Sequence, residues 1–228
     1  MGASPDNLFI IADLRSKGLI PKNASVADVG CQQLRGATPA DMDRFLSHFG
    51  GSCSAAELAH LAGHNTFICE HLIRVGFRYR SFDVVEAPNC EYLDLNTDAV
   101  PRGHRGAFDL VLNFGTTEHV MNQYNAMKIL HDLTKPGGLI YSLFIRGGHM
   151  EHGLLHYSDQ FVGLLCGANR YEPIWRSDQQ EPGNQCTWIV MRKTSEQPFQ
   201  PPVDIQLGEE FPQLMRPPLR RLFRRIAG

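Results

Sequence analysis

A polar cluster able to do chemistry, Thr116-Thr117-Glu118-His119, directly follows an apolar run that ends at Phe114. Histidine titrates near neutral pH, so His119 is the best candidate for a general base that takes a proton from a substrate hydroxyl. A histidine that only hydrogen-bonds the backbone at a helix start is an equally good interpretation. Glu118 would orient His119, bind a substrate amine, or favour the N-terminus of the following helix through its dipole. We therefore name His119 and Glu118 as candidate catalytic residues.

A second group of histidines lies further along the chain, in the segment 149–157. His152 and His156 would share one face of a helix and bind a metal there, but Gly153 between them disfavours a helix. We therefore predict no metal site and expect this segment to contact substrate instead. The candidate substrate-binding residues are Asn122, His152 and Tyr157.

The stretch Asp28-Val29-Gly30-Cys31-Gln32 has the form of a strand entering a tight turn. In a doubly wound sheet the carboxyl ends of the strands face a crevice, and a glycine there lets a ligand approach the backbone closely. A dinucleotide-binding turn needs three glycines at fixed spacing, whereas only Gly30 and the distant Gly36 are present here. A nicotinamide cofactor is therefore disfavoured, and a tight turn without any ligand is the alternative explanation of Gly30.

These residues lie in an alternating series of predicted strands and helices. Apolar, β-branched or aromatic runs predict strands at 25–30, 79–85, 90–95, 108–114, 139–145, 172–176 and 187–192. Apolar residues at helical spacing predict helices at 8–19, 40–49, 54–75, 121–133 and 158–168, with Thr38 and Ser158 as N-caps. Such alternation predicts an α/β fold with a doubly wound, mostly parallel, seven-stranded sheet and helices on both faces. The last two strands are predicted to form a C-terminal antiparallel hairpin.

Length and composition favour one large domain. The 228 residues are 43% hydrophobic and 20% charged, which is enough to bury a full core. We predict a domain over residues 1–195 with a helical insertion at about 36–75, followed by a proline- and arginine-rich arm over 196–228. The insertion and the segment 149–157 are expected to roof the crevice. The arginines between 216 and 225 are compatible with peripheral contact to an anionic membrane or partner, although a solvated chain end is the simpler interpretation.

Charge and cysteine usage indicate which partners and which cellular location to expect. A net charge of -2 offers no field that would attract phosphate backbones, so we expect a small-molecule substrate and no nucleic acid. The six cysteines include no Cys-x-x-Cys pair, which favours a reduced, cytoplasmic location. No apolar run reaches the roughly 20 residues that cross a bilayer, and the first residues do not resemble a signal peptide. The oligomeric state is not predicted by the sequence.

Three motifs together resemble class I S-adenosylmethionine-dependent methyltransferases. Asp28-Val29-Gly30-Cys31 resembles the first motif of that family, Phe108-Asp109-Leu110-Val111 resembles its fourth-strand motif, and Leu133-Thr134-Lys135-Pro136-Gly137-Gly138 resembles the turn into its fifth strand. The resemblance covers about residues 25–145 and implies a Rossmann-like fold, methyl transfer, and S-adenosylmethionine as cofactor. This cofactor carries no phosphate, so its turn needs fewer glycines and more carboxylates to hold its amino and hydroxyl groups.

The resemblance also implies where the cofactor binds. Asp28 and Gly30 would lie against the methionyl part, and Asp83, with Glu86 in reserve, would bind the ribose hydroxyls. Asp94 would accept from the adenine amino group, and residues 113–115 would line the floor beneath the methyl group. The complete set of implied cofactor-binding residues is Asp28, Gly30, Cys31, Gln32, Asp83, Val84, Asp94, Leu95, Asn113, Phe114 and Gly115.

The sequence thus predicts a methyltransferase that acts on a small polar acceptor. Because His119 offers a base, a hydroxyl of a sugar or another metabolite is favoured as the acceptor. Three alternatives stay open: a non-catalytic partner subunit that binds S-adenosylmethionine, an N-methyltransferase, and, least favoured, an NAD-dependent oxidoreductase.

Overall fold

A single sheet forms the centre of the molecule. The structure is a computed structural model and describes residues 2–63, 66–148, 152–181 and 183–202. Seven strands lie in the order β3-β2-β1-β4-β5-β7-β6. They are β1 (Ser25–Val29), β2 (Arg78–Asp83), β3 (Cys90–Tyr92), β4 (Phe108–Asn113), β5 (Thr134–Gly148), β6 (Tyr171–Glu181) and β7 (Asn184–Lys193). Strands β1 to β5 pair in parallel, and β7 is antiparallel to both β5 and β6, which confirms the predicted sheet.

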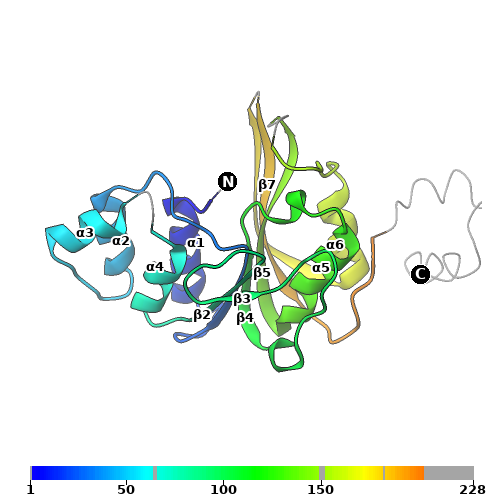
Figure 1. The fold of residues 1–228 in the computed structure, drawn as a ribbon, viewed down its shortest axis with the longest axis horizontal. Coiled ribbons are helices and arrows are strands. Elements are labelled where there is room, and N and C mark those ends of the chain that lie inside the picture. The colour runs from blue at the N-terminus through cyan, green and yellow to red at the C-terminus, as the bar shows by residue number, and fades with distance from the viewer. Residues whose placement is uncertain (1, 64–65, 149–151, 182, 203–228) are drawn as a thin grey trace, which may run out of the picture.

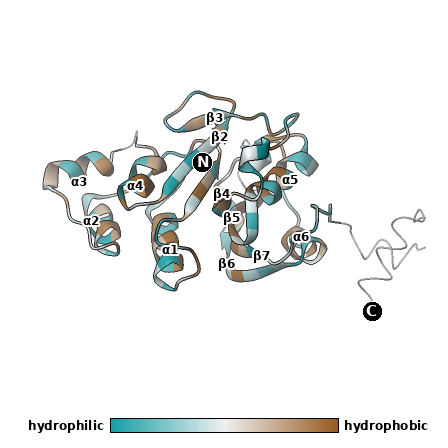
Figure 2. Cartoon of the chain, turned by 90° about the horizontal axis from the view of Figure 1, so that it is seen from below, coloured by the Kyte–Doolittle hydropathy of each residue, from teal (hydrophilic) through white to brown (hydrophobic). Residues whose placement is uncertain are grey.

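Helices cover both faces of this sheet (Figure 1). On one face lie α1 (Pro5–Ser16), α2 (Pro39–Ser47), α3 (Ala55–Leu61) and α4 (Ile68–Arg74), and on the other lie α5 (Gln123–Leu133) and α6 (Phe161–Asn169). Short 3-10 turns, η1 (Arg102–His104) and η2 (Thr117–His119), precede β4 and α5. Figure 2 shows hydrophobic residues in the central strands between the two groups of helices.

Strand β4 explains why the central strands are apolar throughout. Successive residues of a strand point to opposite faces, so a strand covered on both faces needs a continuous apolar run. Leu110 and Leu112 belong to the core under α1, whereas Val111 belongs to the core under α5. Two of the family-like motifs also meet at the start of β4, where Asp109 forms an ion pair with Lys135 and accepts hydrogen bonds from Ser25. These two motifs therefore have a structural role at the end of the sheet where the central strand β4 begins.

The predicted helix over 54–75 is wrong as a single element, because α3 and α4 are separate. The hydroxyl of Thr66 donates to the carbonyl oxygens of Leu61 and Gly63, which takes up backbone groups at the end of α3. The His71 ring then joins the two helices, with Nε2 2.8 Å from the Leu61 carbonyl oxygen and Nδ1 3.1 Å from that of Phe67. By contrast, Thr38 caps α2 as predicted, accepting from the backbone of Asp41.

Other boundaries differ where local hydrogen bonds override the apolar pattern. Helix α1 begins at Pro5, because Asn7 accepts from the backbone N–H of Ser4 and closes the first turn. Ser158 does not cap α6, which starts only at Phe161. Strands β6 and β7 extend well past the predicted 172–176 and 187–192, since the antiparallel ladder between them continues through polar residues to Glu181 and Asn184.

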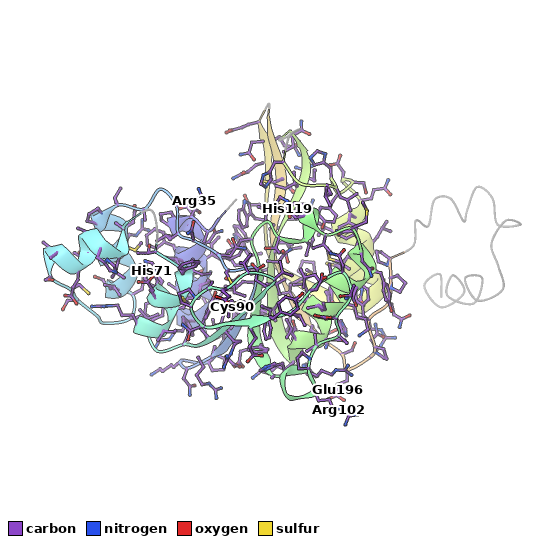
Figure 3. The ribbon with its side chains drawn as sticks, in the orientation of Figure 1. Arg35, His71, Cys90, Arg102, His119 and Glu196 are labelled. Atoms are coloured by element: carbon purple, nitrogen blue, oxygen red, sulfur yellow. The ribbon has the colours of Figure 1, made fainter. Side chains whose placement is uncertain are left out.

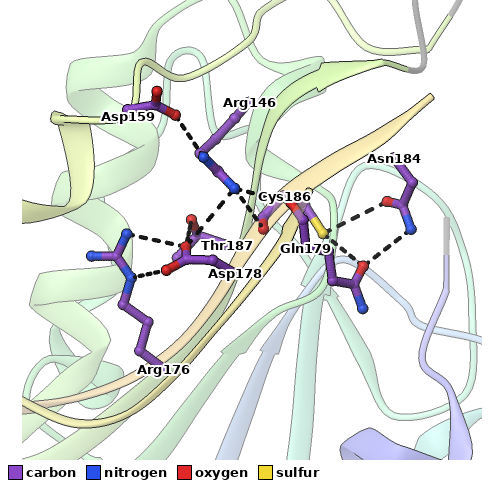
Figure 4. A network of polar contacts seen from close by, with 8 residues as sticks. All are labelled: Arg146, Asp159, Arg176, Asp178, Gln179, Asn184, Cys186 and Thr187. Atoms are coloured by element: carbon purple, nitrogen blue, oxygen red, sulfur yellow. Dashed lines mark hydrogen bonds and ion pairs between the residues drawn. The ribbon is translucent and has the colours of Figure 1, made fainter. Parts of the chain in front are cut away.

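Arg146 ties the end of the long hairpin to the segment before α6 (Figure 4). Its guanidinium donates to Asp159 Oδ1 at 2.6 Å and to the carbonyl oxygens of Gln179 and Cys186 at 3.0 and 3.4 Å. The side chain is only 7% exposed. A buried guanidinium with several acceptors holds three chain segments in one place.

The predicted C-terminal arm begins as part of the domain surface. Phe199 is buried in the core under α5 and α6, and Gln200 exchanges hydrogen bonds with Asn169. The arginine-rich part of the arm lies outside the described residues. Among the helices of the described ranges, none combines the length and the apolar content needed to cross a bilayer.

Candidate active site

Gly30 follows the carboxyl end of β1 and is held in a conformation that favours glycine. Its φ is +96°, and a Cβ added there would lie 2.2 Å from Thr116 Oγ1 and 2.7 Å from Gln32 Nε2. These two side chains are hydrogen-bonded to each other, because Gln32 Nε2 donates to Thr116 Oγ1 at 3.0 Å. We expected the space above Gly30 to be open to the cofactor. That expectation needs correction, because Gln32 and Thr116 fill the space.

Asp28 is a fully buried carboxyl group at the end of β1. Its Oδ2 accepts from Tyr79 Oη at 2.6 Å and from the Gln32 backbone N–H at 3.3 Å. No hydrogen-bond donor from the described residues reaches its buried Oδ1. Burial raises the pKa of Asp28 to about 8, against the lowering effect of these hydrogen bonds. Asp28 is therefore mainly protonated and uncharged at pH 7.

Asp83 lies at the end of the neighbouring strand β2, next to the turn that follows β1. It accepts from the backbone N–H groups of Cys31 at 2.8 Å and of Val84 at 2.6 Å. The Val84 side chain is 54% exposed at this strand end. A partly exposed carboxylate beside an exposed apolar side chain suits a ligand with both hydroxyl groups and a flat apolar surface.

Cys31 also faces the start of β3, where Figure 3 labels Cys90. The two sulfur atoms are 3.1 Å apart, both cysteines are unbonded thiols, and Cys31 Sγ lies 3.4 Å from Ser81 Oγ. The predicted cofactor-binding residues Cys31 and Asp83 are thus in contact, and Cys90, which was not predicted, lies beside them.

The segment after β3 carries Asp94 and Leu95. Asp94 Oδ1 accepts from the Asn96 backbone N–H at 2.8 Å, so the carboxylate stabilises its own turn while staying partly exposed. The Leu95 side chain is buried in the core under α5, and its carbonyl oxygen accepts from Asn125. Asp94 therefore remains available to a ligand, whereas Leu95 can offer only its backbone.

The turn after β4 is built around Asn113. This buried side chain donates from Nδ2 to Thr117 Oγ1 at 3.0 Å and accepts from the backbone of Thr116 and Thr117. Gly115 completes the turn with a φ of +86°. Phe114 needs correction as a cofactor contact, because its fully buried ring packs against Tyr141 and Trp188 in the core under α1.

The turn delivers Glu118 and His119 to one place, where they meet His152 from the segment after β5. Figure 3 labels His119 in the loop between β4 and α5. The Nε2 atoms of His119 and His152 are 3.2 Å apart, and one ligand atom from each of the three residues lies within 4.8 Å of the others. Glu118 is fully buried, His119 is exposed and His152 is half-buried. Desolvation lowers the pKa of His119, so both a neutral base and a neutral ligand are compatible with its environment.

Two predicted substrate residues, Asn122 and Tyr157, have structural roles. Asn122 caps α5 through its side-chain oxygen, and its Nδ2 donates to the Asn96 carbonyl oxygen. Tyr157 is buried, with its hydroxyl 2.9 Å from Thr117 Oγ1 and 2.7 Å from Gln123 Oε1. Because the protein itself occupies the hydroxyl of buried Tyr157, that side chain is not available to a substrate, whereas the substrate role of exposed Asn122 stays a prediction.

A cavity of about 720 Å³ lies behind Tyr141 and Trp188, the two rings against which Phe114 packs. It is bounded by α1, α2 and the strands β5, β6 and β7, and its lining includes Asn7, Arg44, Tyr141 and Trp188. None of the predicted site residues lines it. Within the predicted insertion, α2 packs against α1 and α3 on one face of the sheet, whereas the Ile68 N–H at the start of α4 donates to the Gln32 carbonyl oxygen. That the insertion roofs the site stays a prediction. The segment after β5 does cover Glu118, as its backbone hydrogen bonds show.

Thr116 and Tyr79 are site residues to which the sequence analysis assigned no individual role. Thr116 contacts Gln32 between the turns after β4 and β1, whereas Tyr79, near the beginning of β2, contacts Asp28 near the end of β1. Only the register of the sheet reveals these pairs. For Thr116, the available signal was its membership of the polar cluster before α5.

Comparison with known proteins identifies the fold. Neither a known protein family nor a curated protein matches the chain by sequence. The 1,6-didemethyltoxoflavin-N1-methyltransferase of Burkholderia thailandensis, solved with 1,6-didemethyltoxoflavin and S-adenosylhomocysteine, superposes with a TM-score of 0.51 at 15% identity, over 84% of this chain and 78% of that chain. The CMeT domain of the citrinin polyketide synthase gives a TM-score of 0.51 at 12% identity, over 84% of this chain and 52% of that chain. The chain therefore has the predicted class I methyltransferase fold.

Proposed function

We propose that this chain is an S-adenosylmethionine-dependent methyltransferase acting on a small polar acceptor. The observation that carries the proposal is the row of carboxyl groups at successive strand ends. Asp28 ends β1, Asp83 ends β2 and Asp94 follows β3, in a sheet with the class I methyltransferase fold. In such sheets, ligands bind beyond the carboxyl ends of the strands.

The residues present fit this cofactor. S-adenosylmethionine supplies an electrophilic methyl group on a sulfonium sulfur. Asp83 would accept from the ribose hydroxyls, and the exposed side chain of Val84 would pack on the adenine ring. Asp94 would accept from the adenine amino group. The methionyl ammonium group would approach the buried Oδ1 of Asp28, which no described donor reaches, and its charge would favour the ionised carboxylate that accepts from it.

The acceptor would bind at the turn after β4, next to the strand ends that hold the cofactor. There the acceptor hydroxyl would lose its proton at the cluster of Glu118, His119 and His152. Methyl transfer is an in-line displacement, so the rest of the task is alignment. The Burkholderia thailandensis enzyme is named for methylation at a nitrogen, and amines therefore belong with sugars and phenols in an acceptor screen.

One observation favours a second candidate, a non-catalytic subunit. The hydrogen-bonded side chains of Gln32 and Thr116 occupy the space above Gly30, where a close approach of ligand to backbone was expected. A chain that holds its first turn closed in this way would serve as a binding partner without turnover. Ligand binding in the absence of any methyl transfer is the mark of this alternative.

A thermal-shift series tests the proposed cofactor. S-adenosylmethionine and S-adenosylhomocysteine should raise the Tm, because a ligand that binds only the folded state stabilises it, whereas NAD should not. A shift with NAD alone would support the oxidoreductase and reject our proposal. Release of S-adenosylhomocysteine in the presence of pooled sugars, phenols or amines then separates an enzyme from a non-catalytic subunit.

A further inference from the structure

We infer that Glu118, His119 and His152 form a binding site for a divalent transition-metal ion. One carboxylate oxygen and one imidazole nitrogen from each histidine lie within 4.8 Å of one another. Two imidazoles and one carboxylate form a ligand set that binds such ions while leaving coordination positions open. The sequence led us to expect no metal, and it paired His152 with His156. The structure pairs His152 with His119 instead, and His156 is not part of the cluster.

The spacing of the two imidazoles matches shared coordination. Their Nε2 atoms are 3.2 Å apart, with the ring planes at 88° to each other. Two nitrogens bound at about 2.0–2.1 Å to a tetrahedral ion are about 3.3 Å apart. An ion held by both imidazoles would therefore need the two Nε2 atoms at about the distance that the structure shows.

The backbone holds the segment of His152 directly on Glu118. The N–H groups of Leu154 and Leu155 donate to the Glu118 carbonyl oxygen at 2.8 and 3.2 Å. Gly153 has a φ of +77°, and a Cβ there would lie 3.0 Å from Glu118 Cγ. Glycine at 153 therefore allows the loop to lie against the Glu118 side chain while His152 faces His119. The glycine that argued against a helical metal site makes this non-helical one possible.

A second layer of contacts fixes both halves of the site. On the β4 side, Asn113 and Tyr157 hold Thr117, the residue before Glu118. On the β5 side, the Tyr157 N–H donates to the Ile145 carbonyl oxygen at 2.8 Å, and Asp159 is held by Arg146 (Figure 4). Such preorganisation gives a metal site its affinity, because the ligands need little rearrangement when the ion binds.

The donor atoms indicate which ions fit. Imidazole nitrogens favour Zn²⁺, Co²⁺ and similar transition metals, whereas Mg²⁺ and Ca²⁺ prefer sites made only of oxygen. Beyond binding itself, a role in the reaction rests on the proposed function. An ion at this position would bind the acceptor hydroxyl through an open coordination position and lower its pKa. His119 would then act as a ligand and not as a base.

Calorimetric titration of the chelator-treated chain with Zn²⁺, Co²⁺ and Mn²⁺, with Mg²⁺ for comparison, tests the site. We expect one transition-metal ion to bind per chain and Mg²⁺ to bind far more weakly. His152→Ala and Glu118→Gln should each weaken binding by more than the roughly 10- to 100-fold typical of losing an outer-shell partner. Bound Co²⁺ should give visible absorption bands that change in His119→Ala.

His156→Ala is the matched control, because His156 is an exposed histidine of the same segment outside the cluster. It should bind metal as the unmodified chain does, and circular dichroism checks that each variant folds. The inference is overturned if His119→Ala and His152→Ala bind Zn²⁺ and Co²⁺ as tightly as the unmodified chain, or if His156→Ala loses binding equally. Cofactor affinity is measured separately in chelator. Metal binding without cofactor binding rejects the proposed function alone, and cofactor binding without metal binding rejects only the metal site.

Discussion

The turns that follow β1 and β4 lie side by side, because their strands are paired, yet they are built in opposite ways. The β1 turn is closed: Asp28 is buried and mainly uncharged, and two side chains cover Gly30. The β4 turn is held from beneath by Asn113 and presents His119 outward toward a separate loop. At the carboxyl ends of the strands, the packed β1 turn is thus suited to binding, and the open β4 turn is suited to chemistry.

Thr116 is where the two regions meet. It belongs to the β4 turn, but its hydroxyl accepts from Gln32 of the β1 turn. A change in the conformation of either turn would therefore alter the other turn through the Thr116 side chain. The conformation of the family-like first motif thus depends on a residue of the β4 turn, and the motif does not form a binding turn by itself.

If the β4 turn carries the chemistry, the largest effect should come from His119→Ala. Removing a group that activates the acceptor should lower kcat by roughly 100- to 10,000-fold, while the affinity for S-adenosylmethionine stays unchanged. Steady-state kinetics on the acceptor found by screening, together with calorimetry for the cofactor, measures both. His156→Ala should leave both values unchanged. If His119→Ala keeps the kcat of the unmodified chain, the reaction needs only the alignment of the two substrates.

If the β1 turn is a packed element, the main effect of Gly30→Ala should be on the stability of the fold and not on ligand binding. Backbone strain and overpacking each cost about 1–3 kcal/mol, so the free energy of unfolding should fall by roughly 2–6 kcal/mol. Gly36→Ala is the matched control, because Gly36 has a φ of +70° with nothing within 4 Å of an added Cβ. It should lose only about 1–2 kcal/mol. Urea unfolding compares the two, and equal losses would mean that the Thr116 contact does not matter.

The binding role of the β2 end is tested by Asp83→Ala. Loss of hydrogen bonds to a charged acceptor should weaken S-adenosylmethionine binding by about 1.5–3 kcal/mol, measured by calorimetry. Glu86→Ala, a nearby exposed carboxylate, serves as the control and should bind normally. The reverse result, with Glu86→Ala weakened and Asp83→Ala unchanged, would move the ribose site to Glu86.

Buried Asp28 should leave a signature in the pH dependence of stability. Its pKa is raised from 3.8 to about 8, so the folded chain holds a proton that the unfolded chain releases above pH 4. This contribution to stability is fully present below pH 4 and is lost as the pH rises toward 8, at no more than about 1.4 kcal/mol per pH unit. Asp28→Asn, which mimics the protonated form, should flatten the decline of Tm between pH 5 and 8. Parallel Tm profiles for both chains would contradict the raised pKa.

The sequence predicted the sheet better than it predicted the site. Strands such as 108–114 were recognisable because a strand buried on both faces must be apolar throughout. The break between α3 and α4 was missed, because it depends on the Thr66 hydroxyl and the His71 ring, whose bonds cross the interruption. Strand ends were also predicted too early wherever the hairpin continued through polar residues.

Within the site, the carboxyl groups were predictable and the contacts between loops were not. Asp28 and Asp83 stand at the ends of recognisable strands, so the topology alone brings them to one edge. The approach of His119 to His152 joins two loops that are 33 residues apart, and local spacing holds no information about it. Phe114 shows the opposite error, because a strand-end position does not reveal which face of the sheet a ring will join.

The strand order implies a sequence of folding events. Strand β7 follows all the others in the chain, yet it lies between β5 and β6 and pairs with both. During synthesis, β1 to β5 emerge first, and β5 must wait as an unpaired edge until β7 arrives. Exposed edges of this kind invite pairing with other chains. We therefore expect a chain shortened before Asn184 to aggregate, and translation across the hairpin to be the step at which the nascent protein most depends on chaperones.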